Sequence, residues 1–166
     1  MKTSAYILLA MLLTQQNLLF SKNNVLENDT IQHVFETYFS LKNSLVDSDP
    51  EKATFCAQNL TLALERFQHN DNSSKSSLHV LKIKNVAQQI EKTKDLDEQR
   101  RLFEIISNHL IVFAKQIKSK PEKIFLQFCP MAFNDKGAYW LSERREVRNP
   151  YFGNAMLKCG TSKSLF

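Results

Sequence analysis

The residues best suited to chemistry lie between positions 128 and 160. Cys129 and Met131 are two positions apart, and Met156 and Cys159 are three apart. All three glycines and the only tryptophan lie in the same segment. In an extended segment the first pair would point to one side, and in a helical turn the second pair would do so too. If one segment folds over the other, four sulfur atoms come together.

Such a cluster would suit a soft metal ion. Thiolate and thioether ligands select Cu(I), and by the same softness Ag(I), whereas zinc accepts thiolates but rarely thioethers. Cys129, Met131, Met156 and Cys159 are therefore candidate metal ligands. The same residues also fit a Cys129–Cys159 disulfide with two methionines as core fillers, and closing that loop would stabilise the fold by roughly 3–4 kcal/mol. From the residues themselves, both interpretations stay open.

The histidines offer less. His109 lies on an apolar helical face, where a core histidine with a satisfied hydrogen bond is usual, and His33, His69 and His79 share no spacing. Cys129 as a nucleophile with His109 as base would need a juxtaposition that nothing in the sequence predicts. Glycine-rich phosphate loops and the common hydrolase motifs are absent. We therefore expect no catalytic residues and no enzyme.

The first 21 residues have the pattern of a secretory signal peptide. Lys2 gives a positive start, residues 6–13 are uninterrupted and apolar, and polar residues follow from Thr14. Ser21 is the best small residue for cleavage, and an uncleaved membrane anchor is the alternative. Residues 22–28 are expected to form a flexible lead-in. These features predict export to the periplasm, with no membrane span after signal cleavage.

Charge and cysteine content narrow the choice of partner. The net charge of +5 is modest, and it is scattered without a basic stripe interleaved with aromatic residues, so nucleic acid is a poor candidate for a binding partner.

With three cysteines, at least one stays unpaired within a monomer. Cys56 lies on an apolar helical stripe and is expected to be buried and inert. This leaves Cys129 and Cys159 as the thiols available for chemistry.

Hydrophobic periodicity predicts four amphipathic helices, hence an antiparallel four-helix bundle in a mainly α fold. Asp29 and Gln32 have capping-box spacing at the start of the first helix. Asp49 should cap the second helix, with Pro50 at its first position. The third helix has the weakest pattern: Leu78, Leu81, Val86 and Ile90 are taken as its apolar stripe, with Val80 and Ile83 off it. The fourth follows Asp95 and Glu98, again with capping-box spacing.

After Pro121 the pattern changes. Residues 124–128 and 138–141 are strand candidates on either side of a turn signal at 134–137, which predicts a small β-hairpin packed on the bundle. Residues 143–148 are charged, and a short polar tail ends the chain. We expect one domain over residues 29–162, with a C-terminal Cys/Met module at 123–160.

Several motifs of this module resemble an uncharacterised bacterial periplasmic domain family, a domain of unknown function. The matching segments are Cys-Pro-Met-Ala-Phe at 129–133, Lys-Gly-Ala-Tyr-Trp-Leu-Ser at 136–142, Arg-Asn-Pro-Tyr-Phe-Gly at 148–153 and Met-Leu-Lys-Cys-Gly at 156–160. The helical part is similar too, at residues 38–46 with Asp49, and at Arg101, Phe103 and Ser107. The resemblance covers about residues 30–162.

That family also occurs fused to periplasmic adaptor (membrane-fusion) subunits of copper/silver efflux systems. The resemblance therefore implies metal handling, with Cys129, Met131, Met156 and Cys159 as ligands of Cu(I) or Ag(I). It implies a metal-efflux adaptor or pump component as partner, and His109 is not part of the pattern. We expect the aromatic residues of the module to shield the site: Tyr139, Trp140, Tyr151 and Phe152. The chain departs from the family at residues 78–81, where members often carry a tryptophan.

Overall fold

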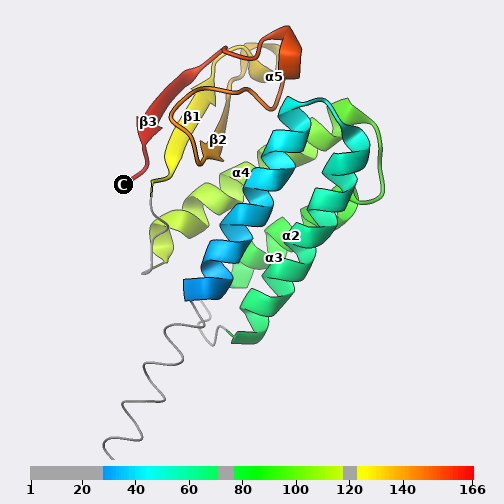
Figure 1. Ribbon diagram of the computed structural model, residues 1–166, viewed down its shortest axis with the longest axis vertical. Helices are drawn as coiled ribbons and strands as arrows, with labels where there is room; N and C mark the ends of the chain where they lie inside the picture. Colours follow the sequence, from blue (N-terminus) through cyan, green and yellow to red (C-terminus); the bar gives the residue numbers. More distant parts are fainter. Residues whose placement is uncertain (1–27, 71–76, 118–122) are drawn as a thin grey trace, which may run out of the picture.

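A bundle of long helices forms the larger part of the molecule (Figure 1). The computed structural model describes residues 28–70, 77–117 and 123–166. The helices run over residues 28–46 (the first helix), α2 Pro50–Asn70, α3 Ser77–Ile90 and α4 Leu96–Gln116. They alternate in direction along the chain, so the predicted antiparallel bundle is confirmed (Figure 1). None of the helices in the described ranges is long and apolar enough to cross a membrane.

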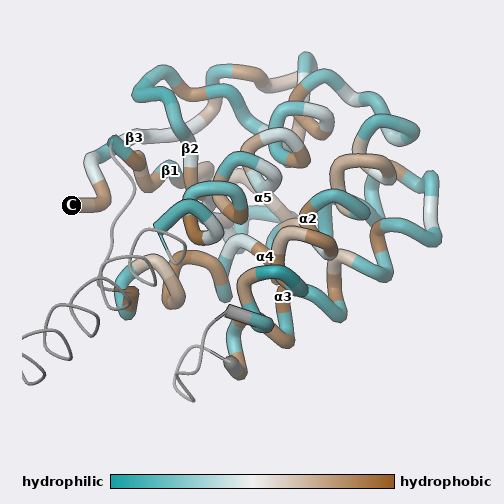
Figure 2. Tube along the Cα trace, turned by 60° about the horizontal axis from the view of Figure 1, so that its bottom comes forward, coloured by the Kyte–Doolittle hydropathy of each residue, from teal (hydrophilic) through white to brown (hydrophobic). Residues whose placement is uncertain are grey.

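The core forms where the apolar faces of these helices meet, as the alternation of hydrophobic and hydrophilic positions suggests (Figure 2). The predicted stripe of the first helix is buried from Ile31 to Leu45, and that of α4 from Leu102 to Ile117. Cys56 on α2 is also buried, as expected, and burial raises the pKa of its thiol. Burial of these side chains is the main favourable contribution to folding.

The stripe predicted for the third helix was right at Val86 and Ile90 and wrong at Leu78 and Leu81. Val80 and Ile83 are fully buried together with Ile90, whereas Leu78 is 71% exposed and Leu81 44% exposed. The helix is therefore rotated about its axis relative to the prediction, because its β-branched residues fill the space against α2 and α4. Packing against neighbouring helices decided between two overlapping stripes that periodicity could not separate.

Two of the predicted helix caps are present. The Asp49 side chain accepts a hydrogen bond from the Lys52 backbone N–H at 2.9 Å, just before Pro50 starts α2. Asp95 accepts bonds from the backbone N–H groups of Asp97 and Glu98 at the start of α4. The reciprocal half of this capping box is not formed, because Thr93 binds the Asp95 backbone N–H instead.

The start of the first helix differs from the prediction. Residue 28 is already helical where the described part begins, so Asp29 lies inside the helix and not at its cap. Gln32, the expected partner of Asp29, instead donates to the Glu36 side chain one turn on, at 3.1 Å. The predicted signal peptide at 1–21 and all of the predicted lead-in except residue 28 lie outside the described residues.

A three-stranded antiparallel sheet lies at one end of the bundle (Figure 1). Its strands are β1 Phe125–Cys129, β2 Ala138–Ser142 and β3 Thr161–Ser164, in the order β2-β1-β3. The predicted β1–β2 hairpin is confirmed. The polar tail, for which no secondary structure was predicted, forms strand β3 and pairs with β1, with Thr161 opposite Phe128. The short elements α5 (Ala132–Asp135) and η1 (Gly153–Ala155) lie between the strands.

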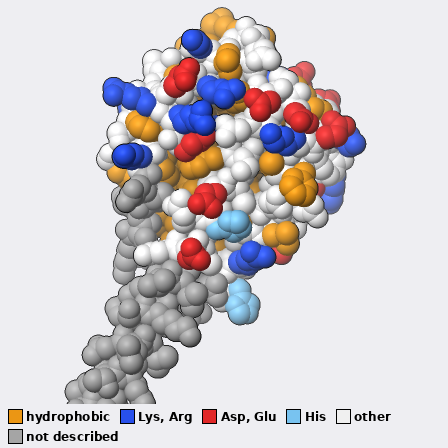
Figure 3. Space-filling view, in the orientation of Figure 1, with side chains coloured by type: hydrophobic (Ala, Val, Ile, Leu, Met, Phe, Trp, Pro, Cys, Tyr) orange, Lys and Arg blue, Asp and Glu red, His pale blue; other side chains and the backbone are white. Residues whose placement is uncertain are grey.

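Acidic and basic side chains intermix on the face seen in Figure 3, in agreement with the scattered charge of the sequence. Lys94 and Glu51, for instance, form an exposed ion pair at 3.2 Å. Exposed pairs of this kind contribute little to stability. The view contains no extended patch of one charge.

Candidate functional site

The two cysteines of the C-terminal segment lie in contact. Cys129 ends the central strand β1 and is fully buried, while Cys159, 30 positions later, is partly exposed. Their sulfur atoms are 2.9 Å apart, and both residues are free thiols. The pair therefore has one member at the edge of the core and one that solvent can reach.

Backbone geometry places Cys159 beside the end of β1. The backbone N–H of Cys159 donates to the Met156 carbonyl at 3.0 Å, which closes a turn immediately before strand β3. The Asn149 side chain, fully buried, donates to the Cys159 carbonyl at 3.0 Å and accepts from the Tyr151 N–H at 2.9 Å. Since β3 pairs with β1, this turn brings the two thiols together.

The two methionines flank the thiols without the geometry that their spacing predicted. Met131 lies in a turn with helical dihedral angles (φ −87°, ψ −7°), so the same-side rule for extended residues does not apply to it. Its side chain is 47% exposed, and its backbone N–H faces the Cys159 thiol. Met156 closes the turn to Cys159 through its carbonyl and is partly buried. Each methionine lies two or three positions from one of the two cysteines. Because the Met131 side chain is half exposed, it can change its rotamer.

The segment after Met131 holds unusual backbone angles. In α5, Phe133 (φ 55°, ψ 54°) and Asn134 (φ 57°, ψ 55°) adopt left-handed conformations. This costs roughly 1–2 kcal/mol for Phe133 and less for Asn134, because asparagine tolerates this region. The Phe133 ring packs edge-on against Tyr151, with ring centroids 5.2 Å apart, and the Gly137 N–H closes the turn onto the Ala132 carbonyl. These contacts hold the strained turn beside Cys129.

Aromatic rings lie on the same face of the sheet as Cys129, since Trp140 is opposite Gln127, two residues before Cys129 on β1. Trp140 is 0% exposed and meets Tyr151 edge-on at 5.6 Å between ring centroids. Tyr151 in turn lies 6.0 Å from the Phe103 ring of α4, and its hydroxyl donates to the Tyr139 carbonyl at 2.6 Å. Tyr151 thus fills the space between sheet and bundle.

The other two expected shielding residues behave differently. Phe152 is only partly buried, and the Tyr139 side chain is 44% exposed, stacking on Phe128 at 4.4 Å between centroids. In β2 alternate side chains point to opposite faces, so Tyr139 and Trp140 cannot both cover the thiols.

Glycine is required at position 160, where the Trp140 ring meets the turn. A Cβ on Gly160 would lie 2.6 Å from the Phe128 carbonyl oxygen.

The Cys159 thiol is protonated at neutral pH, because its pKa lies above the ordinary value. The hydrogen bond with Cys129 raises the pKa of Cys159, burial and the neighbouring thiol add to this, and the Met131 backbone N–H partly offsets it. An ion that binds thiolates must therefore displace protons here, and its affinity should rise with pH.

The separation of the sulfur atoms lies between the distances of two chemical states. A disulfide needs about 2.05 Å, so oxidation requires only a short approach. Two thiolates that bind one ion in tetrahedral geometry, each at about 2.3 Å, lie roughly 3.8 Å apart. A metal ion would thus require the thiols to separate by about 1 Å, which the exposed side of Cys159 permits.

Hydrogen bonds from the first helix and α4 fix the sheet on the bundle. The buried hydroxyl of Tyr38 contacts Ser107 of α4 at 2.8 Å and accepts from the Leu141 N–H of β2 at 3.1 Å. Burial raises the pKa of Tyr38, so the hydroxyl stays neutral. Arg100 of α4 donates to the Pro150 carbonyl at 3.0 Å, in the segment that leads to Tyr151.

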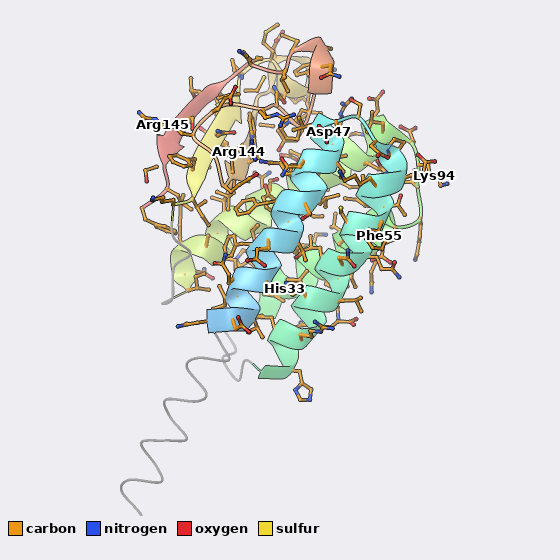
Figure 4. The ribbon with its side chains drawn as sticks, in the orientation of Figure 1. His33, Asp47, Phe55, Lys94, Arg144 and Arg145 are labelled. Carbon is orange, nitrogen blue, oxygen red and sulfur yellow. The ribbon has the colours of Figure 1, made fainter. Side chains whose placement is uncertain are left out.

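An ion pair at the same junction joins a buried lysine to a partly buried glutamate. The Lys42 ammonium, 2% exposed, binds the Glu143 carboxylate at 2.7 Å, and Asn43 donates to the same carboxylate. Burial would raise the pKa of Glu143, but the hydrogen bond and charge of Lys42 lower it overall. Asp47 lies at the end of the first helix nearest the sheet (Figure 4) and pairs with Arg148 at 3.4 Å.

The structure also brings together two histidines that the sequence left apart. His79 of α3 and His109 of α4 have their Nδ1 atoms 2.9 Å apart, and both residues are partly buried. His109 is therefore hydrogen-bonded within the helix interface, as expected, but its partner comes from another helix. Separation along the chain carries no signal for this contact, because it depends on how the two helices are rotated. In the described ranges, no group of three or more His, Cys, Asp and Glu side chains is arranged to hold a metal ion.

Comparison with known families places the helical part. Residues 34–122 match the model of the family described as Protein of unknown function (DUF3347). The chain belongs to this family. The match begins within the first helix, covers α2, α3 and α4, and ends before Cys129, so the thiol pair lies outside the DUF3347 segment. No curated protein and no solved structure matches the chain.

Proposed function

We propose that this chain is an exported periplasmic domain that binds a soft monovalent ion, Cu(I) or Ag(I), through Cys129 and Cys159, in copper homeostasis or efflux. Met131 and Met156 would supply additional thioether ligands. The observation that carries the proposal is the pair of free thiols 2.9 Å apart, joined from positions 30 residues apart. Two thiols, with thioethers in the adjoining turns, match the ligand preference of soft ions.

Solvent access and local flexibility support entry of an ion. Cys159 is partly exposed, and the half-exposed Met131 side chain can swing toward it. Cys129 is held rigidly at the end of β1 beneath aromatic rings, so the more exposed thiol makes the adjustment. An adaptor or pump component of a metal-efflux system would be the partner that receives or delivers the ion.

A competition titration of the reduced protein with a chromophoric Cu(I) chelator tests this proposal. We expect one Cu(I) per chain and at least a roughly hundredfold loss of affinity in Cys129→Ser and Cys159→Ser, about 2.7 kcal/mol, because each removes one of two thiolates. Met131→Leu and Met156→Leu should lose roughly tenfold each. The affinity of the unmodified protein should increase with pH, since Cys159 must release its proton.

Cys56→Ala is the matched control. Cys56 is buried in α2, where Lys52, Ser44 and Asp49 are the groups that act on its thiol, so its removal should leave Cu(I) affinity unchanged. Equal affinity in the Cys129 and Cys159 variants and in the parent protein would contradict the site.

A second candidate is favoured by the same short distance. A Cys129–Cys159 disulfide would make the chain a metal-free interaction module whose exposed aromatic residue, Tyr139, faces a partner. The oxidation requires little movement, and an exported protein meets oxidising conditions.

Counting thiols separates the two candidates. Protein isolated from the periplasm and denatured without reductant should give three reactive thiols if the metal site is available, and one if the disulfide has formed. The count is repeated after mild reduction, because a redox-dependent site gives one thiol before reduction and three afterwards. One thiol together with no Cu(I) binding after reduction would favour the interaction module.

A further inference from the structure

His79 and His109 are close enough to bind one metal ion together. His79 lies near the start of α3 and His109 in the second half of α4, and these two helices pack against each other. Their rings are 5.2 Å apart between centroids, tilted by 51°, with the Nδ1 atoms facing each other at 2.9 Å. In the neutral pair one Nδ1 carries a hydrogen and donates it to the other.

The nitrogen separation matches one class of metal ion. Two imidazole nitrogens that bind one ion at about 2.0–2.1 Å lie roughly 2.9 Å apart if the angle at the metal is near 90°, and roughly 3.3 Å apart if it is tetrahedral. The observed 2.9 Å therefore equals the nitrogen separation of square-planar or tetragonal coordination, and binding requires both rings to turn so that the Nδ1 lone pairs point at the ion instead of at each other. Cu(II) and Ni(II) prefer this geometry with nitrogen and oxygen ligands, and Cu(II) binds more tightly.

The protonation state of His109 also favours metal binding. Burial lowers the pKa of His109, and the neighbouring His79 and Lys82 lower it further, so the ring is neutral at pH 7. A neutral pair binds a metal ion without net loss of protons: the hydrogen on one Nδ1 moves to Nε2 of the same ring, and both Nδ1 lone pairs become available. Lys82 is exposed, so water screens its charge from an incoming cation.

We propose that His79 and His109 form a second, divalent metal site, with Cu(II) as the ion it binds most tightly and water completing the coordination. It differs from the thiol pair in ligand type, oxidation state of the ion and position in the fold. It therefore does not depend on the function proposed above.

Electron paramagnetic resonance tests this site with Cu(II) added to tag-free full-length protein carrying Cys129→Ser and Cys159→Ser, which prevents reduction of copper by these thiols. We expect a tetragonal signal with nitrogen hyperfine splitting. His79→Gln and His109→Gln should each weaken Cu(II) binding by at least about tenfold. His33→Gln and His69→Gln are the matched controls and should leave the affinity unchanged.

A second measurement requires no substitution. In imidazole nitrogen NMR spectra of the unmodified chain, sub-stoichiometric Ni(II) should broaden the His79 and His109 signals and leave those of His33 and His69 sharp. Uniform broadening of all four histidines, or Cu(II) affinity that survives both glutamine variants, would show that the pair is only a hydrogen bond between helices and would overturn the proposal.

Discussion

Replacing Trp140 by alanine is expected to destabilise the protein by about 3–5 kcal/mol, the usual cost of deleting a large buried aromatic side chain. Trp140 is fully buried on β2, packs on Tyr151, and lies 3.3 Å from where a Gly160 Cβ would be. The cavity would separate the sheet from the turn that carries Cys159. Urea unfolding followed by circular dichroism measures the change, since the only tryptophan is lost as a fluorescent probe.

The same substitution should expose the thiol pair. Trp140 and Tyr151 cover the buried side of Cys129, so Trp140→Ala should increase the rate at which a thiol reagent modifies Cys129 in the folded protein. Trp140→Phe is the control: it keeps most of the volume and removes an indole N–H that has no hydrogen-bond partner among the residues that the structure describes. We expect a smaller loss of stability and little change in thiol reactivity. Equal losses in both variants would show that packing of this ring does not hold the site.

Lys42→Met is expected to cost roughly 2–4 kcal/mol at pH 7, because it leaves the partly buried Glu143 carboxylate without its main partner. Asn43 would remain as a donor to the carboxylate, which keeps the cost below that of a fully isolated charge. Urea unfolding of this variant, of Glu143→Gln and of the double variant forms a double-mutant cycle. We expect a coupling of at least about 1 kcal/mol, since the two groups are in direct contact.

Acid provides the control for this ion pair. The pKa of Glu143 is lowered in the folded state, so the stability it adds is present above the ordinary glutamate pKa of about 4.3 and is lost as the pH falls through the folded-state value. The difference in stability between the parent protein and Glu143→Gln should therefore shrink below about pH 4. A difference that stays constant from pH 7 to pH 3 would mean that the carboxylate contributes nothing through its charge.

Local patterns in the sequence were sufficient for much of the scaffold. The caps at Asp49 and Asp95 follow from short side chains that reach backbone N–H groups two or three residues ahead. The wide apolar stripes of the first helix, α2 and α4 leave only one face that can be buried. The hairpin follows from two β-prone runs around a turn. All these features depend on residues close in sequence.

Other features were missed because they depend on partners far along the chain. Strand β3 consists of Thr-Ser-Lys-Ser and pairs with β1 through backbone hydrogen bonds, which composition does not encode. For α3 the sequence allowed two overlapping stripes, and only the shape of the groove between α2 and α4 selects Val80 and Ile83. The contact between His79 and His109 follows from that same rotation.

The thiol pair shows most clearly which features the local sequence determines and which depend on tertiary packing. By itself the sequence determined that Cys129 and Cys159 are the cysteines available for chemistry and that each has a methionine nearby. Only the tertiary structure decided that the two sulfur atoms meet, that one is buried and the other accessible, and that Met131 lies in a turn. The reason is physical: residue types determine which ligands are available, but a distance between atoms 30 residues apart is set by the packing of β3 on β1 and of Tyr151 against the bundle.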